Sequence, residues 1–408
     1  MTPLSNVGDI PEPDEPVLFK DLEKSVRDAP PIIRDATLGF NFRGYVFDKE
    51  NTDNSEDSAN ALGGELKFVT GNFLKIARIG LSYYLSESVG DSENAGATGL
   101  VAPDGDGLQV LGQAFLELGH RGGLQGAFGR RGYRIPYLNT DDSRMIPITQ
   151  EAYVVGRTGT PFDFGIGQFT KTKPKNREDF VAMSEAAGAT GTSDGVSAAW
   201  GILNLSDKTT LGLFNLYGWN TFNTLYAEAN WTDYVLRHSG IKVGAQYTDQ
   251  RSVGDEFMGD FRTWQGGLKL SGSVKSATLT LVHTRTGTDG SVRNPWGGLP
   301  SYNSMMLEDF NRPGEKAWRF TTSITGKSWN VNAWSGFVSF VYGHDARDTT
   351  SGLPAPDVTE LDLTIDYRPT SGPIKGLWVR LRGAYAKFED STSEWETRLI
   401  VNYSMPML

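Results

Sequence analysis

The stretch Glu360-Leu361-Asp362-Leu363-Thr364-Ile365-Asp366-Tyr367-Arg368 alternates strictly, with apolar residues at its odd positions and polar residues at its even positions. Because successive side chains of a strand point to opposite faces, this pattern predicts a β-strand with one apolar and one polar face. Similar alternation ends in Tyr or Trp on the apolar face at residues 225–231, 241–247 and 399–403. Such placement is typical of the aromatic girdles of transmembrane barrels. The pattern favours a transmembrane β-barrel, with a soluble β-sandwich as the alternative.

The composition agrees with a barrel. The chain has 408 residues, a formal net charge of -10 and no cysteine. Its mean hydropathy of -0.36 suits a barrel, because only alternate residues of each strand face lipid. No apolar run approaches the roughly 18 residues of a spanning helix. The lack of cysteine excludes a disulfide scaffold or a thiol nucleophile, and the negative charge argues against a nucleic-acid partner.

The chain divides into two parts. Residues 1–34 contain the acidic, proline-rich run Pro-Glu-Pro-Asp-Glu-Pro (11–16), and we expect an extended periplasmic segment with a short helix at 19–27 that ends before Pro30 and Pro31. Residues 35–408 form the barrel. Residues 1–3 lead straight into polar sequence with no signal peptide, so we interpret the chain as the mature form of an exported protein of the outer membrane of a Gram-negative bacterium.

The length of the strand-rich part sets the barrel size. Spanning strands take roughly 9–11 residues each, so residues 35–408 accommodate about 16 to 18 antiparallel strands. A barrel of this size encloses an aqueous lumen. Short connections such as 327–328 alternate with long ones such as 287–313, as expected for periplasmic turns and outer loops.

Strand parity assigns a set of arginines to the lumen. Arg380 and Arg382 share a face, and an arginine on the lipid face would cost roughly 2–4 kcal/mol near the bilayer midplane. The same reasoning turns Arg398 and Arg43 inward. A closed barrel pairs its first strand with its last, so these arginines belong to one wall. Lys242 and Lys269 face inward on other strands and are further candidates for the solute pathway.

A row of guanidinium groups can bind a carboxylate with two parallel hydrogen bonds and pass it on. Weak and repeated binding is what conduction requires. The alternative is that the arginines pair with lumenal acids such as Glu360, Asp362 and Asp366 and only brace the wall.

Five segments, in this order, resemble the OprD family of substrate-specific outer-membrane porins: LGFNFRGYVFDK (38–49), YLNTDDSRMIPITQ (137–150), FNRPGEKAW (310–318), GLWVRLRGAY (376–385) and ETRLIVNY (396–403). The resemblance implies an all-β, closed antiparallel barrel of 18 strands with both termini in the periplasm, as a monomer or loose homotrimer. It also implies that long extracellular loops fold partly into the lumen. Residues 1–34, 93–108 and 183–195 depart from the family pattern, which leaves the solute open.

The family's inward loops indicate a constriction. By resemblance, Asp142, Ser143 and Arg144 lie at the narrowest point, and the loop with Tyr302 and Asp309 forms a second wall. The alternative places both loops at the outer rim. An acidic constriction opposite the arginines would orient a solute that carries both charges, and a less acidic one would admit plain carboxylates.

We therefore expect a porin for passive, selective diffusion of small carboxylates or amino acids, in contact with outer-membrane lipid and lipopolysaccharide. A general diffusion porin and a structural barrel plugged by residues 1–34 are the alternatives. We expect no enzyme, cofactor or metal site, because none of the histidines (His120, His238, His283 and His344) lies in a catalytic or zinc motif.

Overall fold

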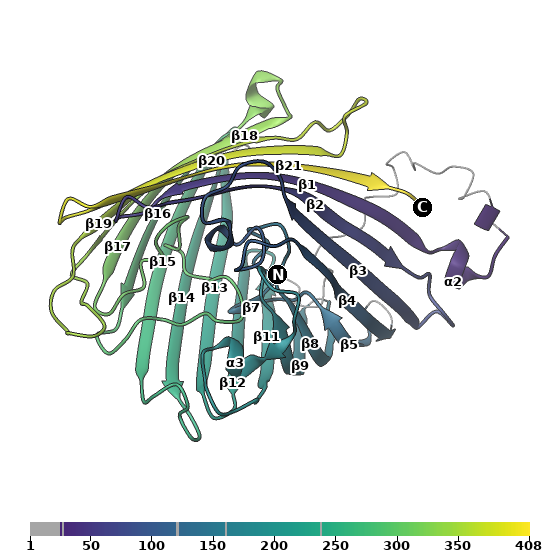
Figure 1. Ribbon diagram of the computed structural model, residues 1–408, viewed down its shortest axis with the longest axis horizontal. Coiled ribbons are helices and arrows are strands. Elements are labelled where there is room, and N and C mark those ends of the chain that lie inside the picture. The colour runs from purple at the N-terminus through teal and green to yellow at the C-terminus, as the bar shows by residue number, and fades with distance from the viewer. Residues whose placement is uncertain (1–24, 27, 120–121, 160, 237–238) are drawn as a thin grey trace.

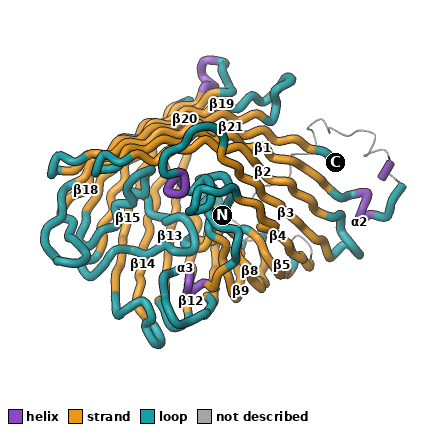
Figure 2. The backbone as a smooth tube through the Cα atoms, in the orientation of Figure 1, coloured by secondary structure: helices purple, strands orange, loops and turns teal. Residues whose placement is uncertain are grey.

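The computed structural model describes residues 25–26, 28–119, 122–159, 161–236 and 239–408. Within these residues, 18 strands form a closed antiparallel barrel (Figures 1 and 2), as the sequence predicts. The strands of the wall are β1 (Thr37–Glu50), β2 (Glu56–Val69), β3 (Ala77–Ser88), β4 (Leu108–Gly119), β5 (Leu124–Arg131), β8 (Thr149–Arg157), β9 (Phe162–Lys173), β11 (Val196–Ser206), β12 (Thr209–Gly218), β13 (Phe222–Leu236), β14 (Ser239–Ser252), β15 (Arg262–Val274), β16 (Ala277–Thr286), β17 (Lys316–Thr325), β18 (Trp334–His344), β19 (Val358–Tyr367), β20 (Leu377–Phe388) and β21 (Ser393–Pro406).

The barrel closes where the two ends of the chain meet. β1 pairs with β21 along a register that runs from Gly39 opposite Pro406 to Glu50 opposite Trp395. Each other strand of the wall pairs with its neighbours in chain order, so no strand edge is left open. A short extra strand, β10 (Val181–Ala182), pairs with β9 beyond the end of β11.

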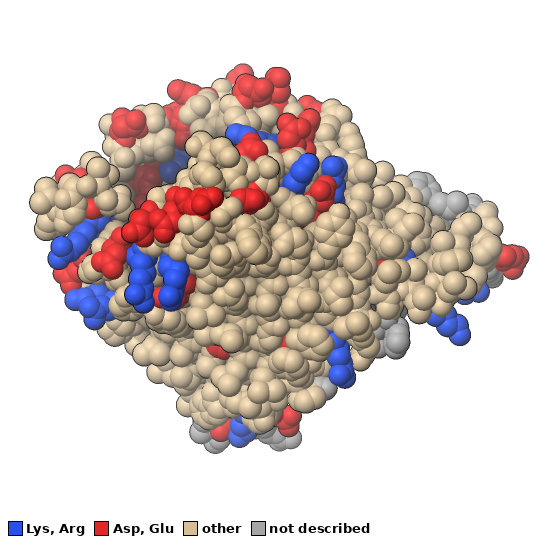
Figure 3. All heavy atoms as spheres, turned by 90° about the horizontal axis from the view of Figure 1, so that it is seen from below, with Lys and Arg blue, Asp and Glu red and all other residues tan. Residues whose placement is uncertain are grey.

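Burial along β19 separates a membrane barrel from a soluble sandwich. The apolar residues Leu361 and Leu363 are 48% and 43% exposed, whereas Glu360 and Asp362 are 1% and 2% exposed. A soluble protein would show the reverse, so the outer face meets lipid and the polar face meets the lumen. Figure 3 shows one side of the molecule with a broad area where almost no charged side chain reaches the surface. The sandwich alternative is therefore wrong.

The two ends of the barrel differ in their connections. One end has long connections, among them 89–107, 174–195 and 345–357, and the other has short turns such as 207–208 and 275–276. Short turns are periplasmic and long loops extracellular in barrels of this kind. The start of β1 and the C-terminus lie at the short-turn end, where the backbone N–H of Leu408 donates to the carbonyl of Leu38.

Helices are few and short in the described part of the chain. They are α2 (Pro31–Arg34), α3 (Met183–Ala186) and the 3-10 helices η1 (Ala95–Thr98) and η2 (Gly326–Trp329). The expected helix at 19–27 falls mainly outside the described residues. Of that segment the structure describes Ser25 and Val26, which are helical, and a turn follows at Asp28. The two prolines then begin a further helix, with Pro30 at the N-cap and Pro31 in the first turn, where the missing N–H of proline costs nothing. No described helix is long and apolar enough to cross a membrane.

Candidate pore constriction

Two long connections lie inside the barrel, and neither remains at the outer rim. The first inner loop (residues 132–148) contains a small hairpin of β6 (Arg134–Ile135) and β7 (Leu138–Asn139). Tyr137 shares a 2.7 Å hydroxyl hydrogen bond with Thr248 on β14, while Met145 and Ile146 pack in a cluster with Tyr45 on β1. The loop therefore crosses the lumen from β14 to β1.

The second inner loop (residues 287–315) follows the opposite side of the lumen. Trp296 stacks on Phe222 at 5.0 Å, and Phe310 packs against Val341 and Val358. Large aromatic side chains buried against the inner face fix the course of a loop without regular structure. Together these contacts place both loops inside the lumen, as the family resemblance predicts.

The predicted arginines form one row on the inner face of β1, β20 and β21, which we call the basic wall. Strand register sets their order from the long-loop end to the short-turn end. Arg382 lies directly opposite Arg398, Arg380 lies one step lower opposite Ile400, and Arg43 lies lower still opposite Asn402. The row follows the barrel axis, and its members come from strands at both ends of the chain.

The upper guanidinium groups differ in how far they are neutralised. Arg380 binds Asp366 through two hydrogen bonds of 2.8 and 2.9 Å, and Arg398 is paired with Glu396. Arg382 makes no ion pair with a described residue, and its Nε donates to the Thr364 hydroxyl at 3.3 Å. Among Arg380, Arg382 and Arg398, Arg382 therefore has the most N–H donors available to bind a solute.

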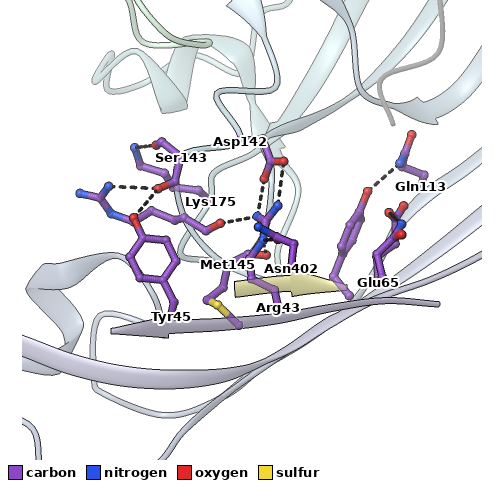
Figure 4. A network of polar contacts seen from close by, with 12 residues as sticks. Arg43, Tyr45, Glu65, Gln113, Asp142, Ser143, Met145, Lys175 and Asn402 are labelled. Carbon is purple, nitrogen blue, oxygen red and sulfur yellow. Dashed lines mark hydrogen bonds and ion pairs between the residues drawn. The ribbon is translucent and has the colours of Figure 1, made fainter. Parts of the chain in front are cut away.

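Arg43 lies at the centre of a polar network (Figure 4). Its Nη1 and Nη2 atoms donate to the two carboxylate oxygens of Asp142 at 2.6 and 3.1 Å. Nη1 also donates to the backbone carbonyl of Arg144 at 2.6 Å, and Nε donates to Asn402 Oδ1 at 2.7 Å. The Tyr45 hydroxyl donates to the carbonyl of Ser143 at 3.1 Å. The first inner loop is thus attached to the basic wall.

Arg144 and Asp141 of the first inner loop also have partners. Arg144 donates from Nε to the carbonyl of Thr98 at 2.7 Å and lies 4.9 Å from the Phe47 ring. Lys175 pairs with Asp141 at 2.9 Å. Burial raises the pKa of Asp141, but the Lys175 ammonium outweighs burial and the pKa lies below its usual value. Asp141 therefore carries its negative charge at neutral pH.

Two cavities meet at the Arg43–Asp142 pair. The upper cavity, about 210 Å³, is lined by Arg43, Asp142, Arg144, Arg380, Arg382 and Arg398 among others. The lower cavity, about 230 Å³, is lined by Arg43 and Asp142 together with Asn41, Glu65, Tyr84 and Ser404. Asn402 and Trp378 border both cavities. The Arg43–Asp142 pair therefore borders both cavities.

A carboxylate anchors the second inner loop to the barrel. Glu360 on β19 accepts hydrogen bonds from the backbone N–H groups of Met306, Leu307 and Glu308 at 3.0, 2.9 and 2.9 Å. Burial, with help from Glu394, raises the pKa of Glu308 to about 7. Burial likewise raises the pKa of Asp309, whose carboxylate accepts a 2.6 Å hydrogen bond from Ser304.

Tyr302 and Lys269 lie on the far side of the lumen from the basic wall. The Tyr302 hydroxyl donates to Glu228 at 2.9 Å, and the Lys269 ammonium lies 3.9 Å from the Tyr302 ring. Lys242 is exposed toward the lumen on β14. The structure thus gathers the predicted arginines and Asp142, Ser143 and Arg144 around one cavity, but places Lys242, Lys269 and Tyr302 elsewhere.

The alternative interpretation, in which the arginines pair with lumenal acids and only brace the wall, applies to part of the basic wall. Asp366 does pair with Arg380, whereas Glu360 and Asp362 bind backbone of the second inner loop. Sequence reasoning missed Arg319 of β17, whose Nη1 lies 3.9 Å from the Met305 sulfur of the second inner loop, and Lys175, which pairs with Asp141. The alternation of Ala317, Arg319 and Thr321 with Trp318 and Phe320 could have identified Arg319 as inward. No sequence signal identified Lys175, which lies in a connection with no strand parity.

Comparison with known proteins gives a consistent result. The family model described as "outer membrane porin, OprD family" matches residues 127–407. Porin D of Pseudomonas aeruginosa is 23% identical over 298 residues, which cover 67% of each chain. Among solved structures, Pseudomonas aeruginosa OccK9 (OpdG) gives a TM-score of 0.83 at 19% identity, and OpdK with vanillate gives 0.81 at 20% identity. Each covers 92% of this chain and 100% of the solved chain.

Proposed function

Because the chain belongs to the OprD family of outer-membrane porins, we propose that it mediates passive, selective diffusion of small carboxylate-containing solutes along the basic wall. The chain is an outer-membrane channel and not an enzyme. The observation that carries the proposal is the upper cavity, which Arg43, Arg144, Arg380, Arg382 and Arg398 all line. Guanidinium groups match carboxylate geometry, so such a cavity favours carboxylates over neutral sugars.

The roles along the path follow from how far each group is neutralised. Arg382 has most capacity to receive a carboxylate from the long-loop end. Arg380 and Arg398 share their charge with Asp366 and Glu396, so each offers a weaker site. A series of partly neutralised sites allows release as well as capture, which conduction requires. OpdK, with the same fold, was solved with vanillate, an aromatic carboxylate, which makes this solute class a sensible first choice.

Reversal potentials in a planar bilayer under a KCl gradient test the proposal. We expect anion preference in the natural chain and a shift toward cations in the variant Arg380→Ala plus Arg382→Ala. The matched control Lys208→Ala plus Lys327→Ala removes the same charge from residues exposed at the short-turn end and should keep anion preference. Cation preference in the natural chain that the arginine variant leaves unchanged would refute the proposal.

Liposome uptake then identifies the solute. A panel of benzoate-type carboxylates, basic amino acids and neutral sugars separates a carboxylate channel from a general diffusion porin. Equal uptake of sugars and carboxylates of the same size would favour general diffusion. The absence of any conductance would favour a plugged barrel.

A further inference from the structure

We propose that Asp142 occupies Arg43 as an internal substitute for the solute's carboxylate, so that a solute passes from the upper to the lower cavity by displacing it. This inference rests on the proposed function and adds a step to it. The Asp142 carboxylate of the first inner loop then competes with the solute carboxylate for Arg43.

The geometry of the pair supports this role. Both oxygens of Asp142 face two different nitrogens of Arg43, at 2.6 and 3.1 Å. This two-point arrangement is the one that a free carboxylate adopts on a guanidinium. Asp142 therefore fills the position that a solute carboxylate would take on this arginine (Figure 4).

The pair can exchange without moving the loop. The Asp142 side chain is 43% exposed, and Arg43 is the one described donor to its carboxylate. The loop keeps its other attachments to β1, namely the Arg43 bond to the Arg144 carbonyl and the Tyr45 bond to the Ser143 carbonyl. Rotation of the Asp142 side chain into the solvated cavity is thus sufficient to free Arg43 for a solute.

Arg43 itself remains in place during the exchange. Its Nε stays bound to Asn402 Oδ1, and this bond fixes the orientation of the Asn402 amide. The Asn402 Nδ2 atom then lies buried without a partner among the described residues, at the border of the lower cavity. Because this donor is shielded from the cavity, the exchange takes place on Arg43 alone, where the exposed Asp142 carboxylate now lies.

The competition has a consequence for transport. A tethered carboxylate acts at a high effective concentration, so it weakens the apparent affinity of Arg43 for solute and speeds release. Without it, the guanidinium would hold a carboxylate more tightly and conduct it more slowly. Asp142 would therefore raise the maximal transport rate at the expense of affinity.

The variant Asp142→Asn tests the inference, because asparagine keeps the size of the side chain and removes its charge. Benzoate interrupts the chloride current of single channels while it occupies the pore. In the variant we expect benzoate residence times longer by about tenfold and a lower concentration for half-maximal block. Benzamide, the neutral isostere, should show no such change.

The control variant Asp104→Asn removes one negative charge from an exposed residue of the 89–107 connection and should behave as the natural chain. In the double variant Asp142→Asn plus Arg43→Gln the gain in residence time should disappear. Unchanged or shorter benzoate residence in Asp142→Asn would overturn the inference. The proposed function would then stand if the natural chain still prefers anions, and it would fall separately if the natural chain prefers cations.

Discussion

The two inner loops both contact the barrel wall through a carboxylate, but in opposite ways. The first inner loop supplies the acid, Asp142, which binds an arginine of the wall through an exposed side-chain pair. The second inner loop supplies backbone N–H groups, which bind Glu360 of the wall at a position 1% exposed. A solute carboxylate can reach Arg43 and replace Asp142, whereas Glu360 is shielded from the lumen, and its separation from the loop would leave N–H donors unpaired.

This difference separates a movable part of the constriction from a fixed one. We infer that the first inner loop regulates passage through exchange of a side chain, while the second acts as a rigid wall that sets the width of the path. Variants at Asp142 should therefore change how long a solute stays bound, whereas variants at Glu360 should change the width of the path.

Removal of the Glu360 anchor should have the largest effect. In Glu360→Ala, the backbone N–H groups of Leu307 and Glu308 lose their acceptor at a cost of about 1–3 kcal/mol each, while that of Met306 keeps Asp362. We expect the second inner loop to leave its position, which raises single-channel conductance and the rate of proteolytic cleavage within 287–315. Glu360→Gln keeps one acceptor oxygen and should give an intermediate result.

The same proteolysis assay sharpens the contrast, because Asp142→Asn should leave the first inner loop as protected as in the natural chain. Equal protection of the second inner loop in Glu360→Ala and the natural chain would contradict its fixed attachment.

A second, smaller effect should follow pH. The pKa of Glu308 is raised to about 7, above its ordinary value of 4.5, so the packed loop favours the protonated carboxyl. The cost of ionising Glu308 is absent below its unfolded pKa, grows as pH rises toward 7 and is constant above it. Packing of the second inner loop should therefore weaken between pH 5 and pH 8, by up to roughly a hundredfold in the opening equilibrium.

Proteolysis at several pH values measures this change, and Glu308→Gln should be protected equally at pH 5 and pH 8. A pH dependence that persists in Glu308→Gln would assign the effect to another group, such as Asp309.

The smallest effect should come from Tyr302→Phe. The change removes a 2.9 Å hydrogen bond to Glu228, but Tyr226 and Asn230 still donate to that carboxylate. The ring beneath Lys269 is retained. We expect a loss of about 1 kcal/mol or less in thermal unfolding and little change in conductance. A large rise in conductance would show that this contact, and not Glu360, holds the second inner loop.

The amino-acid sequence by itself determined the barrel and the faces of its strands. Leu361, Leu363 and Ile365 had to face lipid because their neighbours Glu360 and Asp362 are polar, and the same rule turned Arg380 and Arg382 inward. Closure of the barrel then brought Arg43 beside these arginines, since the first strand must pair with the last. The assignment of Asp142, Ser143 and Arg144 to an inward loop came from family resemblance, because a loop has no periodicity to read.

Only the tertiary structure decided which of these charges are available. Asp142 lies 99 positions from Arg43 in the chain, and their pairing depends on the path of the first inner loop across the lumen. Glu360 has the same parity as Asp366, yet one binds loop backbone and the other binds Arg380. Strand periodicity fixes the direction of a side chain but not its partner, because partners inside a wide lumen come from loops that no local pattern positions.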